Sequence, residues 1–130
     1  MKKKFIICLV LLTTAIITKA QTATEAWPEL KAFHKAMSAT FHPAEDGNLK
    51  PIKQKSGELA LKASKLQNSF VPQEFNKPNI NASVKKLAAE SKVLNELVKS
   101  KAKDEIILKN LTALHDRYHE IVGLCKDEKH

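Results

Sequence analysis

Apolar residues recur along most of the chain at alternating spacings of three and four, the periodicity of one face of an α-helix. The first stripe consists of Trp27, Leu30, His34, Met37 and Phe41. The second consists of Leu49, Ile52, Ser56, Leu59, Ala63, Leu66 and Phe70. The third consists of Val84, Leu87, Ser91, Leu94 and Val98. The fourth consists of Leu108, Leu111, His115, Tyr118, Val122 and Cys125. The stripes predict helices at about residues 25–42, 49–70, 80–101 and 104–126.

Helix-breaking residues separate these stripes. Pro43 is expected to end the first helix ahead of a polar turn, Pro72 follows the second helix, and Asp104 suits the N-terminus of the fourth electrostatically. Four helices joined by mostly short turns predict an all-α fold, an up-down-up-down antiparallel four-helix bundle formed by residues 21–130.

Residues 1–20 have the features of a signal peptide. Three lysines at positions 2–4 precede an apolar run from Phe5 to Ile17, and Thr18-Lys19-Ala20 offers small residues for cleavage before Gln21. The run falls short of the roughly 20 apolar residues that span a bilayer. The sequence therefore predicts a periplasmic or secreted protein without a stable membrane span after cleavage.

Composition and charge narrow the function classes. The chain of 130 residues has 22 Lys+Arg, 14 Asp+Glu and a net charge of +8, but four of its lysines lie in the predicted leader. Acidic residues such as Glu58, Glu90 and Glu96 are interspersed among the remaining lysines. This pattern is typical of solvated helix faces, so no nucleic-acid partner is expected. Three glycines and 5% aromatic residues argue against a β-sandwich or barrel.

Three histidines stand on the expected inner faces of the first and fourth helices. His119 follows His115 by one turn, so their imidazoles project from one side of the helix. In the predicted topology the first and fourth helices are antiparallel neighbours, and the start of one is level with the end of the other. Counting from these ends places His34 level with His115 and His119, and Met37 level with residues 108–116. The four side chains are therefore expected within roughly 11 Å of rise.

These side chains are suitable metal ligands. Neutral imidazole binds zinc, copper, nickel or haem iron, and a thioether favours copper(I) or haem iron. The sequence therefore predicts a transition-metal centre (copper, zinc or iron) held by inward-facing His34, His115 and His119, with Met37 as a further candidate. In the alternative interpretation these histidines are core residues, bonded to neighbours or reaching solvent at the bundle edge.

Two further residues, His42 and Cys125, each have more than one possible role. His42 is expected to cap the C-terminus of the first helix, with metal ligation as the alternative. Cys125 is the single cysteine after the leader and is expected to be buried as an apolar residue. A reactive thiol, a cross-link to a partner and a soft metal ligand remain open for it.

The segment from Leu111 to Tyr118 resembles the last helix of the cytochromes c-prime, which are exported four-helix bundles with a Cys-x-x-Cys-His pattern near the C-terminus. By that resemblance His115 occupies the position of the axial histidine. Leu111 and Leu114 occupy the positions of the haem-linking cysteines, which excludes covalent haem attachment through that motif.

The pair Tyr118-His119 is similar instead to the end of the periplasmic b-type bundle cytochromes. That resemblance implies a non-covalent haem between Met37 and His119, with His34 and His115 as the alternative axial ligands.

The leading functional hypothesis is a cytochrome-like helical protein that handles metal or transfers electrons, with a redox or metal-donor protein as partner. Non-covalent haem binding is the first alternative, and a cofactor-free interaction module is the second. His115 to His119 differs from the zinc-peptidase helix signature by Asp116 in place of glutamate, so no enzyme activity is expected. A homodimer is compatible with the sequence.

Overall fold

The computed structural model describes residues 22–127, which are all-helical and contain no strand. Its elements are α1 (Ala23–Ala26), α2 (Pro28–Glu45), α3 (Lys50–Gln67), the 3-10 helix η1 (Gln73–Phe75), α4 (Pro78–Lys99) and α5 (Asp104–Asp127). The predicted signal peptide at residues 1–20 lies outside the described residues. Within residues 22–127, no helix combines the length and the apolar character needed to cross a membrane.

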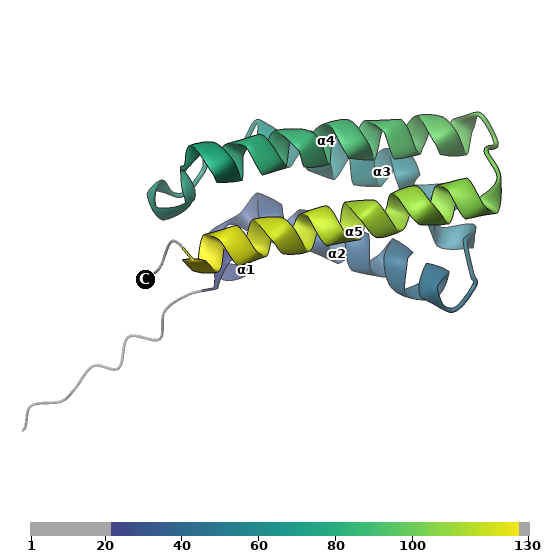
Figure 1. Ribbon diagram of the computed structural model, residues 1–130, viewed down its shortest axis with the longest axis horizontal. Helices are drawn as coiled ribbons and strands as arrows, with labels where there is room; N and C mark the ends of the chain where they lie inside the picture. The colour runs from purple at the N-terminus through teal and green to yellow at the C-terminus, as the bar shows by residue number, and fades with distance from the viewer. Residues whose placement is uncertain (1–21, 128–130) are drawn as a thin grey trace, which may run out of the picture.

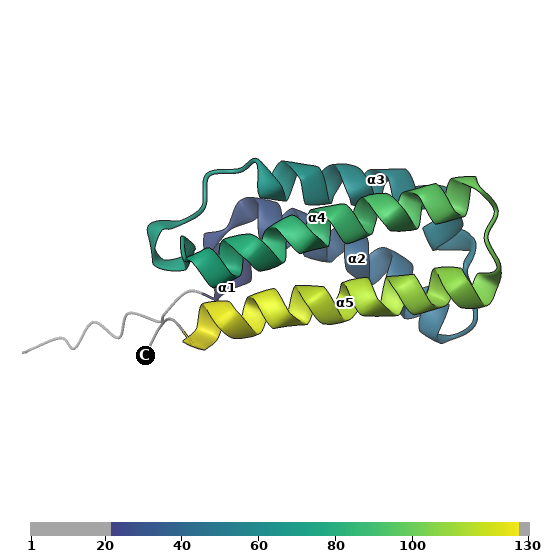
Figure 2. The same ribbon diagram turned by 45° about the horizontal axis from the view of Figure 1, so that its top comes forward.

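The four long helices lie side by side in a bundle-like arrangement, and successive helices run in opposite directions (Figures 1 and 2). Helix α2 packs against α3, α3 against α4, and α4 against α5. Helix α5 also contacts α2, which brings the first and the last long helix together. This neighbourhood of α2 and α5 was expected from the sequence, and it positions the histidines.

The first predicted helix differs from the structure at both ends. A capping box between Thr22 and Glu25 starts α1, and extended backbone at Trp27 separates α1 from α2. Helix α2 then continues past Pro43, where the sequence predicted its end, as far as Glu45. Proline is tolerated there because it lies in the last turn, where little helix follows the hydrogen bond that it removes.

The second predicted helix is shorter in the structure than expected, because α3 ends at Gln67. The Ser69 hydroxyl donates to the carbonyl of Leu66 at 2.7 Å and accepts a 2.9 Å hydrogen bond from the indole of Trp27. Phe70, predicted to lie on the buried face, follows this exit from the helix and is 88% exposed. That prediction was wrong because the helical periodicity no longer applies beyond Gln67.

The buried faces of α2 and α5 keep several residues of the expected stripes, such as Leu30 and Leu111, but they do not include the histidine positions. Phe33 and Leu114 are fully buried, whereas their neighbours His34 and His115 lie beside the core. Burying a large apolar side chain contributes about 1.5–3 kcal/mol, which favours phenylalanine and leucine over imidazole at these inner positions. The prediction that the histidines face inward is therefore wrong.

Ionic contacts fix the rotation of α5 about its own axis. Arg117 reaches α4, where its Nη2 lies 2.9 Å and its Nε 3.2 Å from Oε1 of Glu90. The same guanidinium also contacts Glu120. Because residues two positions apart on a helix do not share a face, this contact with α4 leaves His115 and His119 on another side of α5.

Candidate functional site

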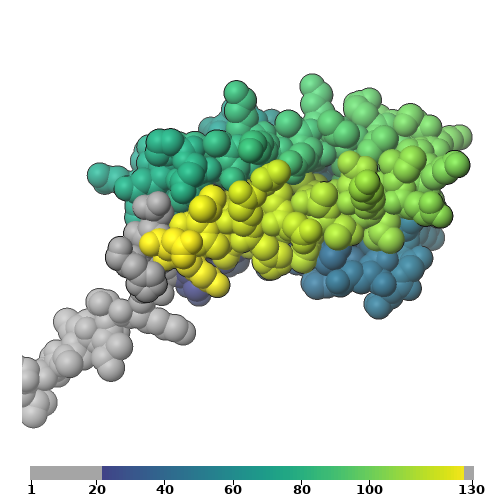
Figure 3. Space-filling model, viewed as in Figure 1, coloured from purple at the N-terminus to yellow at the C-terminus, as the bar shows by residue number. Residues whose placement is uncertain are grey.

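Six rings from α2 and α5 form a continuous series of contacts along the seam between the two helices. Figure 3 shows α5 crossing one face of the molecule, with α4 along one side and residues of α2 along the other. Along the series, the centroid distances are 4.7 Å for His34–Tyr118, 5.4 Å for Tyr118–His119, 4.4 Å for His119–His115, 3.8 Å for His115–Phe41 and 6.0 Å for Phe41–His42. The structure thus brings the three predicted histidines into one cluster, and it adds Phe41 and His42.

The closest pair of ligand atoms in this cluster belongs to His115 and His119. Their Nε2 atoms lie 3.1 Å apart, and the two rings meet edge to face at 76°. Without a metal this spacing fits a hydrogen bond from a protonated nitrogen to an unprotonated one. It also fits two ligands of one ion, since metal–nitrogen distances of about 2.0–2.1 Å would give an angle of about 100° at the metal.

The surroundings of His115 favour its neutral form. Phe41 stacks on the ring at 3.8 Å and 13° and half-buries it. This burial is the largest cause lowering the pKa of His115, followed by the charge of His119, while Asp116 and Glu45 act in the opposite direction. A neutral imidazole presents the lone pair that a metal ion needs, so little proton competition is expected near pH 7.

His34 lies at the other end of the ring series. It is exposed but stacks nearly parallel on Tyr118, at 4.7 Å and 6°. Burial is the largest cause lowering its pKa, followed by the charges of His119 and His42. His34 is therefore also neutral near pH 7 and lies close to the His115–His119 pair.

Met37 and Cys125 lie on the opposite, inner side of these helices. Both side chains are fully buried in the hydrophobic core. The sequence expected Met37 to face the histidines, but its thioether packs among apolar side chains while His34 and His119 are exposed. The burial expected for Cys125 is confirmed.

The last turn of α2 carries a pair that the sequence reasoning did not combine. His42 Nδ1 lies 3.3 Å from Glu45 Oε2, and the side chains are 66% and 53% exposed. The sequence predicted His42 to be a helix cap, with metal ligation as the alternative, and predicted no role for Glu45. Their spacing of three residues, which places both on one face of a helix, is the signal that could have revealed the pair.

As the side chains stand, the cluster contains pairs of ligands but no larger set. Within residues 22–127, no three His, Cys, Asp or Glu side chains converge closely enough to enclose an ion. Full coordination in this cluster would therefore need water, a ligand from a partner, or rotation of exposed side chains.

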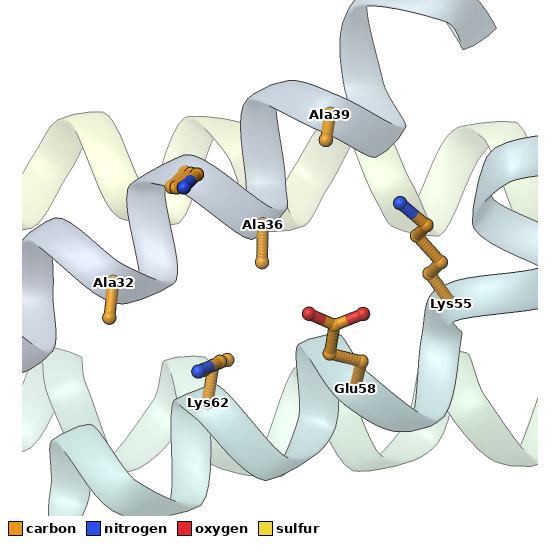
Figure 4. A pocket seen from close by; sticks show the side chains of 7 residues that line it. Ala32, Ala36, Ala39, Lys55, Glu58 and Lys62 are labelled. Atoms are coloured by element: carbon orange, nitrogen blue, oxygen red, sulfur yellow. The ribbon is translucent and has the colours of Figure 1, made fainter.

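A hollow of about 400 Å³ lies elsewhere, between α2 and α3. Figure 4 shows Ala32, Ala36 and Ala39 of α2 facing Lys55, Glu58 and Lys62 of α3 across it. Neither a histidine nor Met37 lines this hollow, so it does not provide the pocket that the haem hypothesis requires. The haem site stays a prediction.

Comparison with known proteins gives no independent assignment. No protein-family model, no curated protein and no solved structure matches this chain. The similarity to cytochromes therefore stays a prediction from the short stretches around His115 and His119.

Proposed function

We propose that this protein is an exported metal-handling protein in which His115 and His119 hold one divalent transition-metal ion, with His34 as a neighbouring candidate ligand. The observation that carries the proposal is the 3.1 Å distance between the two Nε2 atoms. Two ligands separated by one helical turn need little rearrangement to share an ion. The lowered pKa of His115 further supports binding at neutral pH.

The donor atoms favour particular ions. Burial of Met37 removes the soft thioether from the cluster and with it the preference for copper(I). Imidazole suits Cu²⁺, Ni²⁺ and Zn²⁺, and the general order of divalent affinities makes Cu²⁺ the tightest. Iron, haem and electron transfer stay predictions that no contact in the described residues favours.

A two-histidine site at the edge of the helix seam suits transfer of an ion better than permanent storage. Structural zinc sites are closed by four protein ligands, whereas two ligands leave positions open for water or a partner's side chain. We accordingly propose metal delivery or uptake with a metal-donor protein, and no catalytic role. The proposal includes a cleaved signal peptide at residues 1–20, a periplasmic location and an up-down-up-down bundle topology.

Calorimetric titration of the purified protein with Zn²⁺ and Cu²⁺ tests this function. One ion per chain is expected, with a loss of at least about tenfold in affinity for each of His115→Gln and His119→Gln, equivalent to 1.4 kcal/mol. Ala113→Gln, at an exposed position of the same helix, is the matched control and should bind as the wild type does. Equal affinities in all four proteins would refute the assignment.

A further inference from the structure

The last turn of α2 is held in a defined position beside the histidine pair of α5. Gly47, with a φ of 85°, ends the helix. The backbone N–H of Asn48 donates to the Pro43 carbonyl at 2.9 Å, and the backbone N–H of Gly47 donates to the Ala44 carbonyl at 3.0 Å. These two bonds form a Schellman motif, which fixes the backbone that carries His42 and Glu45.

Phe41 connects the two pairs of potential ligands. Its ring centroid lies 3.8 Å from that of His115 and 6.0 Å from that of His42. The sum of these two distances is therefore an upper limit on the separation of the two imidazoles. Each imidazole in turn has a close partner, His119 for His115 and Glu45 for His42.

The position of Glu45 is unfavourable for an ordinary surface carboxylate. It lies at the C-terminus of α2, where the helix dipole disfavours negative charge. A divalent cation beside it would reverse this penalty and receive a carboxylate ligand. Oxygen from glutamate together with histidine nitrogens is a common ligand set for zinc.

We propose that His42 and Glu45 are the third and fourth ligands of the ion bound by His115 and His119, so that the metal links the end of α2 to α5. This inference rests on the proposed function and specifies its ligand set. In the absence of metal, each pair is satisfied internally, at 3.3 Å and 3.1 Å. When an ion binds, His42 and Glu45 turn toward it, which the exposure of both side chains permits.

Zn²⁺ affinity in matched pairs of variants tests the ligand set. Glu45→Gln is compared with Asp46→Asn, which removes the same charge from the adjacent exposed residue. His42→Gln is compared with Ala39→Gln, which places the same side chain at an exposed position one turn earlier on α2. We expect Glu45→Gln and His42→Gln each to weaken binding by at least about tenfold. We expect Asp46→Asn and Ala39→Gln to change it by less than about threefold. His34→Gln is the competing variant, because His34 is the other candidate for the third ligand.

The Co²⁺ spectrum gives a second readout, which a general charge effect would not change. A four-ligand protein site gives intense visible bands typical of tetrahedral Co²⁺, and loss of Glu45 or His42 should weaken them toward the pale spectrum of a hydrated ion. Melting temperatures without metal should be unchanged in all five variants, because every substituted side chain is exposed.

The outcomes separate this inference from the proposed function. If wild-type protein binds Zn²⁺ and loses it in His115→Gln, but Glu45→Gln and His42→Gln match their controls, the α2 ligands are refuted and the function stands. If His34→Gln alone weakens binding, His34 is the third ligand and the inference is overturned. If wild-type protein binds neither Zn²⁺ nor Co²⁺, both proposals fail.

Discussion

Substitution of Met37 separates a core role from a ligand role. The side chain is fully buried in the hydrophobic core, so Met37→Ala removes apolar contacts and leaves a cavity. Comparable buried substitutions cost about 2–5 kcal/mol. In a domain of about 100 residues each 1 kcal/mol lowers the melting temperature by about 4–8 °C, so a decrease of about 8–40 °C is expected.

Met37→Leu is the informative partner variant. Leucine conserves the volume and should cost less than about 1.5 kcal/mol, but it has no sulfur. Urea unfolding followed by circular dichroism measures the stability of both variants, and Zn²⁺ and Cu⁺ titrations at 20 °C measure binding. The structure predicts wild-type metal affinity in Met37→Leu. A folded Met37→Leu protein that has lost metal or haem binding would refute the core assignment and restore the thioether as a ligand.

The remaining predictions concern titration and backbone geometry. Because the pKa values of His34 and His115 are lowered on folding, the unfolded chain binds more protons below about pH 6.5. The free energy of unfolding in metal-free buffer should therefore fall from pH 7.5 to pH 5. The double variant His34→Gln/His115→Gln should show a weaker pH dependence, and the same dependence as in the wild type would contradict this explanation. Burial raises the pKa of Tyr118, the single tyrosine, to about 12. Absorbance at 295 nm should accordingly show ionisation of the Tyr118 hydroxyl near pH 12 in folded protein. The free energy of unfolding should decrease as the pH rises above about 10, the pKa of an unfolded tyrosine. Ionisation near pH 10 before unfolding would show that the ring is not buried. Lys101 adopts a φ of 55° after α4, a conformation that glycine adopts without steric cost. Lys101→Gly should therefore raise the free energy of unfolding by about 1 kcal/mol in a urea titration. A less stable variant would be the contrary result.

Much of the helical architecture was predictable from apolar periodicity. The third and fourth helices were expected within about two residues of α4 and α5, and most predicted seam residues of α3 and α4 are buried. Errors occurred where local chemistry overrides periodicity. The Ser69 hydrogen bonds end α3 before Phe70, and the Schellman motif at Gly47 lets α2 extend past Pro43.

The sequence predicted the level of the candidate site along the helix axes, but not the side of the helices on which it lies. Antiparallel packing of α2 and α5 was enough to bring His34, His115 and His119 together. The sequence pattern did not determine whether His34 or Phe33 faces the core, since both lie within one residue of the same stripe. Packing decides for Phe33, which moves the imidazoles to the outer edge of the seam and leaves Met37 inside. The His42–Glu45 pair could not be placed without knowing where α2 ends.

We expect one metal ion to bind between the Nε2 atoms of His115 and His119. Electron paramagnetic resonance of the protein with one equivalent of Cu²⁺ tests it most directly, because electron spin echo modulation detects the remote nitrogen of each coordinated imidazole. We predict a single copper species with at least two coordinated imidazoles, and the loss of an imidazole signal in His119→Gln. A spectrum identical to that of Cu²⁺ in buffer, or one unchanged by His119→Gln, would show that these two histidines do not hold the ion.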